Sequence, residues 1–212
     1  MKYPILYSFR RCPYAMRARI ALKYSEITYV HREVQLSNRP QELYQISPKG
    51  TVPVFVTSKK KVIEESLDIM HYCLRVKDLK NWYKDDQVKQ DKIIEENDSK
   101  FKKALDNYKY HVRFKEKSYE TYQKEVVKFL NEYNKILKVQ KYLINENSKL
   151  SDYAIFPFIR QCAHVDIKWF KSNFKYLSLW LEEFKSSNLF LSTMQKYDVW
   201  YEGIQDIIVK ND

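Results

Sequence analysis

The spacing of apolar residues changes several times within the first 77 residues of the chain. Short apolar or alternating runs rich in Val, Ile, Tyr and Phe are typical of strands, and apolar residues three or four positions apart are typical of amphipathic helices. The predicted strands cover residues 4–9, 28–36, 51–56 and 62–65, and the predicted helices cover residues 13–24, 39–46 and 67–76. The resulting order, β-α-β-α-β-β-α, predicts an α/β domain over residues 1–77.

After residue 77 the spacing is helical throughout, and no proline or glycine interrupts it between Pro53 and Pro157. Three sets of apolar residues share a helical face: Ile94, Phe101, Leu105 and Tyr108; Tyr122, Val126, Phe129, Tyr133 and Ile136; and Ile155, Phe158, Cys162 and Val165. This pattern predicts an all-helical bundle over residues 87–212, joined to the first domain by a polar linker over residues 78–86.

The composition is that of a globular chain of one or two domains, with 212 residues and 44% hydrophobic residues. Only 2 residues are glycine, against roughly 15 at average usage, which excludes the glycine-rich loops of dinucleotide and P-loop sites. No apolar run reaches the roughly 18 residues of a membrane span, and none at the N-terminus suggests a signal peptide. The 3 cysteines show no paired spacing, so no disulfide framework is expected. We expect a cytoplasmic protein that does not bind membranes.

The net charge of +11 raises the possibility of a nucleic-acid partner. Residues 1–77 contain 14 Lys and Arg against 6 Asp and Glu, whereas residues 78–212 contain 24 against 21. The positive excess therefore lies in the first domain, and the remainder has the mixed charges of a solvated surface. Because most aromatic residues follow helical periods, they are better explained as core than as base-stacking groups, and we do not expect nucleic acid to be the partner.

Chemistry is indicated most clearly by Cys12, within the segment Arg10-Arg11-Cys12-Pro13-Tyr14-Ala15. The cysteine directly precedes a predicted helix, where free backbone N–H groups, the helix dipole and the two arginines favour the thiolate. Dithiol oxidoreductases have a second cysteine at the position of Ala15, so this site is predicted to form mixed disulfides with an external thiol. The alternative is a buried cysteine that only packs as a small hydrophobic residue.

Two further segments suggest ligand binding. Proline within a strand is normally an edge or bulge feature, and a cis bond before Pro53 would present the Val52 backbone to an extended peptide ligand. Ser66 is predicted to cap the helix that follows, with Glu65 before it. The free N–H groups of that helix could hold a carboxylate and Glu65 could pair with an ammonium group, although a simple helix cap explains the local pattern equally well.

Together, C-P-Y-A at residues 12–15, P-K-G-T-V-P-V at 48–54 and E-E-S-L-D-I at 64–69 resemble the N-terminal domain of the glutathione transferase superfamily. The likeness is to its cysteine-type, glutaredoxin-related classes, such as omega. Residues 151–161 resemble the central helix of the C-terminal domain, which a capping box opens in that family; Asp152 matches, but Lys149 replaces the hydroxyl residue. The resemblance implies a thioredoxin-like N-terminal domain followed by an all-α helical bundle.

The resemblance also implies roles for individual residues. Cys12 would exchange with a glutathione sulfur, and Val52 would pair its backbone with the cysteinyl part of glutathione, held by cis Pro53. Glu65 and Ser66 would bind the γ-glutamyl end. The full set implied to bind glutathione is Pro13, Tyr14, Arg39, Lys49, Val52, Pro53, Glu65 and Ser66, with Arg39 near the glycyl end and Lys49 the weaker of the two basic candidates.

Other candidate residues are better explained by packing. Tyr7 lies on the first predicted strand, where other classes keep a catalytic tyrosine, but we expect a packed strand residue. The four histidines lack ligand spacing, so no metal site is predicted, and Cys73 and Cys162 lie on apolar helix faces. Aromatic residues of the first long helices would line a cleft for a second substrate, which would be small and hydrophobic or thiol-bearing.

The resemblance implies a glutathione transferase with thiol-transferase activity, which uses Cys12 to exchange or remove glutathione in mixed disulfides and adducts. Glutathione would be the co-substrate, and the chain would form a homodimer. A conventional glutathione-conjugating transferase is one alternative. Another is a non-catalytic binding protein on the same scaffold, like the stringent starvation proteins that associate with RNA polymerase.

Overall fold

The chain forms two compact units in this computed structural model, which describes residues 1–211. The first, here called the thioredoxin-like unit, combines residues 1–80 with the C-terminal segment that begins at Asn188. The second, here called the helical unit, covers Asn81–Ser187.

The thioredoxin-like unit is built on a mixed sheet, which within residues 1–211 has five strands in the order β4-β3-β1-β2-β5. The strands are β1 (Ile5–Ser8), β2 (Tyr29–Glu33), β3 (Val54–Val56), β4 (Val62–Ile63) and β5 (Ile207–Val209). β1 and β2 are parallel, with Ile5 opposite Val30, and the other neighbouring pairs are antiparallel. The predicted α/β thioredoxin-like fold of the N-terminal domain is confirmed.

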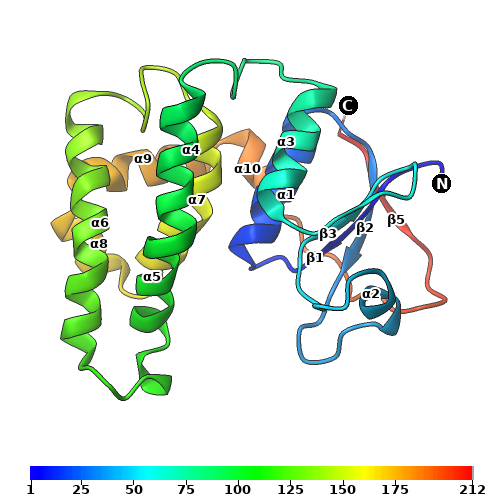
Figure 1. Ribbon diagram of the computed structural model, residues 1–212, viewed down its shortest axis with the longest axis horizontal. Coiled ribbons are helices and arrows are strands. Elements are labelled where there is room, and N and C mark those ends of the chain that lie inside the picture. Colours follow the sequence, from blue (N-terminus) through cyan, green and yellow to red (C-terminus); the bar gives the residue numbers. More distant parts are fainter. Residues whose placement is uncertain (212) are drawn as a thin grey trace. The chain divides into compact units, whose positions relative to one another are not determined.

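Helices cover both faces of this sheet. They are α1 (Pro13–Tyr24), α2 (Gln41–Ile46), α3 (Ser66–Val76) and α10 (Asn188–Thr193). Figure 1 shows α1 and α3 side by side on one side of the sheet and α2 on the other. The α2 face has an apolar core in which Ile5, Tyr7 and Val54 pack with Leu43 of α2 and Trp200 of the C-terminal segment. These layers hold the start of α1 and the start of α3 at defined places above the sheet.

The C-terminal segment corrects the prediction that residues 87–212 are all helical. β5 pairs antiparallel with β2, and Trp200 donates its backbone N–H to the Glu33 carbonyl at 2.8 Å. The physical reason is that β2 would otherwise be an edge strand with free hydrogen-bonding groups, and the β-branched run Ile207–Val209 covers that edge. The division between the two units, after Lys80, lies within the linker predicted over residues 78–86.

The helical unit is a bundle, as predicted. Its α-helices are α4 (Gln87–Glu96), α5 (Lys102–Lys109), α6 (Tyr119–Val139), α7 (Leu150–Ala163), α8 (Ile167–Asn173) and α9 (Lys175–Ser186). A π-helical turn, Asn97–Phe101, joins α4 to α5, and a 3-10 turn, His111–Arg113, follows α5. None of the described helices combines the length and apolar character needed to cross a bilayer.

The buried face of α6 differs in part from the prediction. Tyr122, Val126 and Tyr133 are buried as expected, but Leu130 and Leu137 complete the face in place of Phe129 and Ile136. Phe129 is half-buried, and its ring lies 5.7 Å from that of the fully buried Phe101.

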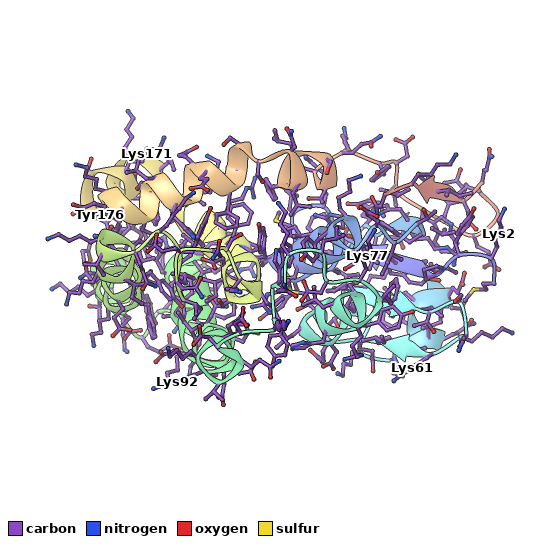
Figure 2. All side chains as sticks on the ribbon, turned by 90° about the horizontal axis from the view of Figure 1, so that it is seen from above. Lys2, Lys61, Lys77, Lys92, Lys171 and Tyr176 are labelled. Atoms are coloured by element: carbon purple, nitrogen blue, oxygen red, sulfur yellow. The ribbon has the colours of Figure 1, made fainter. Side chains whose placement is uncertain are left out.

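The thioredoxin-like unit carries positive charges both on its surface and in its interior. Figure 2 shows the labelled Lys2 and Lys61 at the margin of this unit, and the side chain of Lys77 is also exposed. Three of the arginines that contribute to its positive excess are instead buried, namely Arg17, Arg19 and Arg32, with 0%, 2% and 9% of their surface exposed. Part of the positive excess of this unit is therefore internal to the fold.

Candidate functional site

Cys12 occupies the N-cap position of α1, with Pro13 as the first helical residue. The loop from Phe9 to Cys12 closes a turn, in which the Cys12 N–H donates to the Phe9 carbonyl at 3.0 Å. The first turn of α1 has no acidic residue. Cys12 is half-buried, so its sulfur lies at the positive end of the helix dipole with partial access to solvent. Such an environment favours a thiolate over a thiol.

The segment Gly50–Pro53 brings the Val52 backbone to this cysteine. The Val52–Pro53 peptide bond is cis, as predicted. The Cys12 Sγ lies 3.6 Å from the Val52 carbonyl oxygen, a distance at which a thiol can donate a hydrogen bond. Gly50 starts the segment with φ +60°, and a Cβ there would lie 2.3 Å from the ring of Tyr44. One of the two glycines of the chain is thus placed where a side chain would be strained.

The start of α3 supplies a second helix N-terminus. The prediction that Ser66 caps this helix is wrong, because Glu65 is the N-cap residue and Ser66 is the first helical residue. No side chain caps this end. Ser66 is buried, and its Oγ accepts a hydrogen bond from Arg17 at 3.4 Å. The backbone N–H groups of the first turn remain suited to a carboxylate.

Glu65 and Lys49 form an ion pair with 3.1 Å between Nζ and Oε1. Their side chains are 69% and 58% exposed, so this pair contributes little to folding stability. The hydrogen bond to Glu65 raises the pKa of Lys49. An ammonium group from a ligand would compete with Lys49 for the same carboxylate.

Arg39 and Tyr14 complete the predicted set. Arg39 is half-buried and comes directly before Pro40, the N-cap residue of α2. Its Nε is buried and has no hydrogen-bond partner within residues 1–211, which fits a donor that awaits an acceptor. The Tyr14 ring lies 5.7 Å from the guanidinium carbon of Arg17. The described contacts bring Cys12 to Val52 and Lys49 to Glu65, whereas none of them joins Arg39 to these four residues.

Two buried ionic residues beside the Cys12 loop were not selected from the sequence. Arg19 of α1 and Glu33 of β2 both hydrogen-bond to the backbone of Arg10. Arg17 of the same helix is also fully buried. No local pattern in the sequence identifies Arg19 and Glu33, because their partners are backbone groups that only folding brings close.

Tyr7 and the other two cysteines behave as packed residues. The Tyr7 hydroxyl donates to Glu42 Oε1 at 2.9 Å and accepts from Arg32 at 2.6 Å, and burial raises its pKa. Cys73 and Cys162 are fully buried, and burial raises the pKa of both thiols. Cys12 therefore differs from them in being partly accessible and at a helix start.

The chain is similar in sequence and in fold to several known proteins. Residues 6–79 match the family model of the glutathione S-transferase N-terminal domain. The chain is 25% identical over 182 residues to glutathione S-transferase omega-1 of Mus musculus, covering 83% of this chain and 74% of that protein. It is 26% identical over 215 residues to pyrimidodiazepine synthase of Drosophila melanogaster, covering 94% and 84%. A solved glutathione transferase from Phanerochaete chrysosporium, in complex with oxidized glutathione, has a TM-score of 0.78 at 15% identity, covering 90% of this chain and 94% of that one.

Proposed function

We propose that this chain, a member of the glutathione transferase superfamily, uses Cys12 to exchange or remove glutathione in mixed disulfides and adducts. The observation that supports this most strongly is the position of the Cys12 sulfur, at the start of α1 and 3.6 Å from the Val52 carbonyl oxygen. The helix dipole favours the thiolate there, and a glutathione backbone paired with Val52 would bring its own sulfur beside it.

The proposed exchange has two balanced steps. The Cys12 thiolate attacks the glutathionyl sulfur of a mixed disulfide, so that a Cys12–glutathione disulfide forms and the substrate leaves as a thiolate, which then takes a proton from water. The thiolate of a second glutathione attacks that bond, releases oxidized glutathione and restores the Cys12 thiolate. Ala15 stands where a resolving cysteine would be, so the external thiol completes the cycle.

Glutathione would be held along the segment from Val52 to Ser66. Its cysteinyl backbone would pair with Val52, and its γ-glutamyl carboxylate would lie at the start of α3 by Ser66. Its ammonium group would pair with Glu65, displacing Lys49. The buried donor Nε of Arg39 is suited to the glycyl carboxylate. Pro13 and Tyr14 would contact the ligand from the first turn of α1.

The assembly and location follow as further parts of the proposal. We propose a homodimer, because the superfamily resemblance implies one, and light scattering at micromolar concentration tests it directly. We propose action in the cytoplasm, where thiols are kept reduced and Cys12 would remain free for exchange.

The proposal is tested by comparing the wild-type protein with Cys12→Ser. The wild type should be retained on glutathione resin and should reduce the mixed disulfide of glutathione and 2-mercaptoethanol. Cys12→Ser should lose at least about a thousandfold in exchange rate, since the covalent route is removed, but should still be retained. Cys73→Ala, which changes a buried cysteine, should keep the exchange rate of the folded protein.

Other results would point to the alternatives. Disulfide exchange that persists in Cys12→Ser would contradict the assignment of Cys12 as the nucleophile. Turnover of 1-chloro-2,4-dinitrobenzene without disulfide exchange would make the chain a conjugating transferase. Retention on the resin without either activity would favour a binding protein on the same scaffold.

A further inference from the structure

The side chain of Arg19 crosses from α1 to the loop that ends at Cys12. It is 2% exposed, and its guanidinium hydrogen-bonds to four oxygens in separate residues. NH1 donates to Ser8 Oγ at 2.5 Å and to the Phe9 carbonyl at 3.4 Å, and NH2 donates to the Arg10 carbonyl at 2.7 Å. Nε donates to the Thr193 carbonyl at 3.0 Å. One side chain thus fixes the segment that leads into the cysteine.

Glu33 holds the same loop from the opposite side. Its Oε1 accepts the Arg10 N–H at 2.7 Å, and its Oε2 lies 2.9 Å from His31 Nε2. The N–H and the carbonyl of Arg10 are therefore bound by two buried side chains of opposite charge. This residue lies two positions before Cys12, so its backbone has little freedom to move the cysteine away from the start of α1.

Only arginine can make the set of contacts found at Arg19. Its fork of five N–H donors reaches several acceptors at once, whereas the lysine ammonium is a compact point charge on a flexible stem. Burying a cation among carbonyl oxygens is costly, and a neutral polar network could hold a loop without that cost. A positive charge buried this close to Cys12 also acts on the ionisation of its thiol.

The buried charged groups near the cysteine are Arg19 and Glu33, with Arg17 also buried on the same helix as Arg19. Burial lowers the pKa of Arg19, and Tyr29, Glu33, Cys12 and Tyr197 oppose that shift. Burial also lowers the pKa of His31 and raises the pKa of Tyr29 and Tyr197, so these groups are neutral near pH 7. Arg10 and Arg11 lie on the loop itself. Because electrostatic coupling is reciprocal, an arginine that the Cys12 thiolate stabilises must stabilise that thiolate.

We propose that Arg19 is a positioning residue for Cys12, fixing residues 8–10 by its hydrogen bonds and favouring the Cys12 thiolate by its buried positive charge. Glu33 is its counterpart, holding the same backbone but opposing the thiolate by its negative charge. The inference rests on the proposed role of Cys12 as nucleophile.

The test is the rate of Cys12 alkylation by iodoacetamide as a function of pH, with peptide mapping of the modified cysteine. Arg19→Gln should raise the thiol pKa by about one unit, which lowers the alkylation rate below that pKa about tenfold. Arg19→Lys keeps the charge and should recover most of the pKa. Glu33→Gln should lower the pKa, by less than about one unit. The control Lys61→Gln removes an exposed charge of the same unit and should leave the pKa unchanged.

The directions of the Cys12 pKa shifts in Arg19→Gln and Glu33→Gln distinguish an electrostatic role from a structural one. If Arg19→Gln and Glu33→Gln only loosen the loop, they will shift the pKa in the same direction, or not at all, and the inference is overturned. If Arg19→Gln does not fold, a Glu33→Gln pKa equal to or above that of the wild type overturns it alone. A wild-type Cys12 that titrates as an ordinary thiol contradicts the proposed function itself, before any variant is compared.

Discussion

Both units of this protein contain buried ionic side chains that hydrogen-bond to the backbone, but the segments that these side chains fix differ in kind. In the thioredoxin-like unit Arg19 and Glu33 bind a short loop that ends in a partly accessible cysteine. In the helical unit Asp152 is fully buried and accepts hydrogen bonds from the backbone of Leu143 and Lys149. A buried charge therefore indicates function only through what it positions. The same physical device would serve the proposed chemistry of Cys12 in one unit, and it serves stability in the other.

The network of Asp152 shows the structural use clearly. Its carboxylate accepts the N–H groups of Leu143 and Lys149, both at 2.9 Å, and the indole N–H of Trp180 at 3.1 Å. Lys149 occupies the position of the hydroxyl residue of a capping box. Its Nζ donates hydrogen bonds to the Asn81 carbonyl and to the Asp85 carboxylate. The carboxylate half of the box is present, and the lysine ties the start of α7 to the start of the unit.

The largest effect in this comparison is expected for Asp152→Ala. Three buried N–H donors would lose their acceptor, at about 1–3 kcal/mol each, so we expect a loss of about 4 kcal/mol in the free energy of unfolding. Urea unfolding measures this loss. The alkylation rate of Cys12 in the folded variant should equal that of the wild type, and a changed rate would break the distinction between the two units.

The pH dependence of Asp152→Asn gives the next largest effect. Burial raises the pKa of Asp152 from 3.8 to about 6, despite its hydrogen bonds, so the folded state binds this proton more tightly than the unfolded state. The contribution of Asp152 to the free energy of unfolding is thus fully present below the pKa that Asp152 has in the unfolded state. It is lost as pH rises through the pKa that Asp152 has in the folded state. Since two pKa units correspond to about 3 kcal/mol, the cost of Asp152→Asn should grow by that amount between about pH 7 and about pH 4. A pH-independent cost would show that Asp152 has an ordinary pKa.

The smallest effect concerns the exposed ion pair at the start of α3. Glu65→Gln should weaken glutathione binding about tenfold, or about 1.4 kcal/mol, with almost no change in stability. Glu26→Gln is the matched control, because Glu26 is also an exposed glutamate of the same unit and pairs with a lysine, Lys77. Isothermal titration calorimetry with glutathione compares them. Equal affinities for the two variants would remove Glu65 from the binding site.

The fold was largely predictable because hydrophobic period is a local property. The alternation of strands and helices over residues 1–77 and the helical faces after it follow from side-chain spacing alone. The return of β5 to β2 was not predictable in this way. The run Ile207–Val209 is three residues long, and its strand character depends on an edge that lies more than 170 residues away in the sequence.

The candidate site was predictable where a residue type has a local reason to be there. Pro13 marks the first residue of a helix, so Cys12 is placed at the helix start. Pro53 interrupts a strand pattern, so Val52 is placed at an edge or bulge of the sheet. Arg19 and Glu33 have no such local signal, because their partners are backbone groups brought close only by folding. For the same reason the count of charges over residues 1–77 does not reveal that Arg17, Arg19 and Arg32 are buried.

The most direct test of the central claim is to expose the wild-type protein to oxidized glutathione and to determine which cysteine carries the glutathionyl group. Intact mass should show one added group per chain, and peptide mapping should place it on Cys12. Arg19 and the start of α1 favour a thiolate there, whereas Cys73 and Cys162 are buried with raised pKa values. Modification of Cys73 or Cys162 ahead of Cys12, or no modification of the folded protein, would contradict the account.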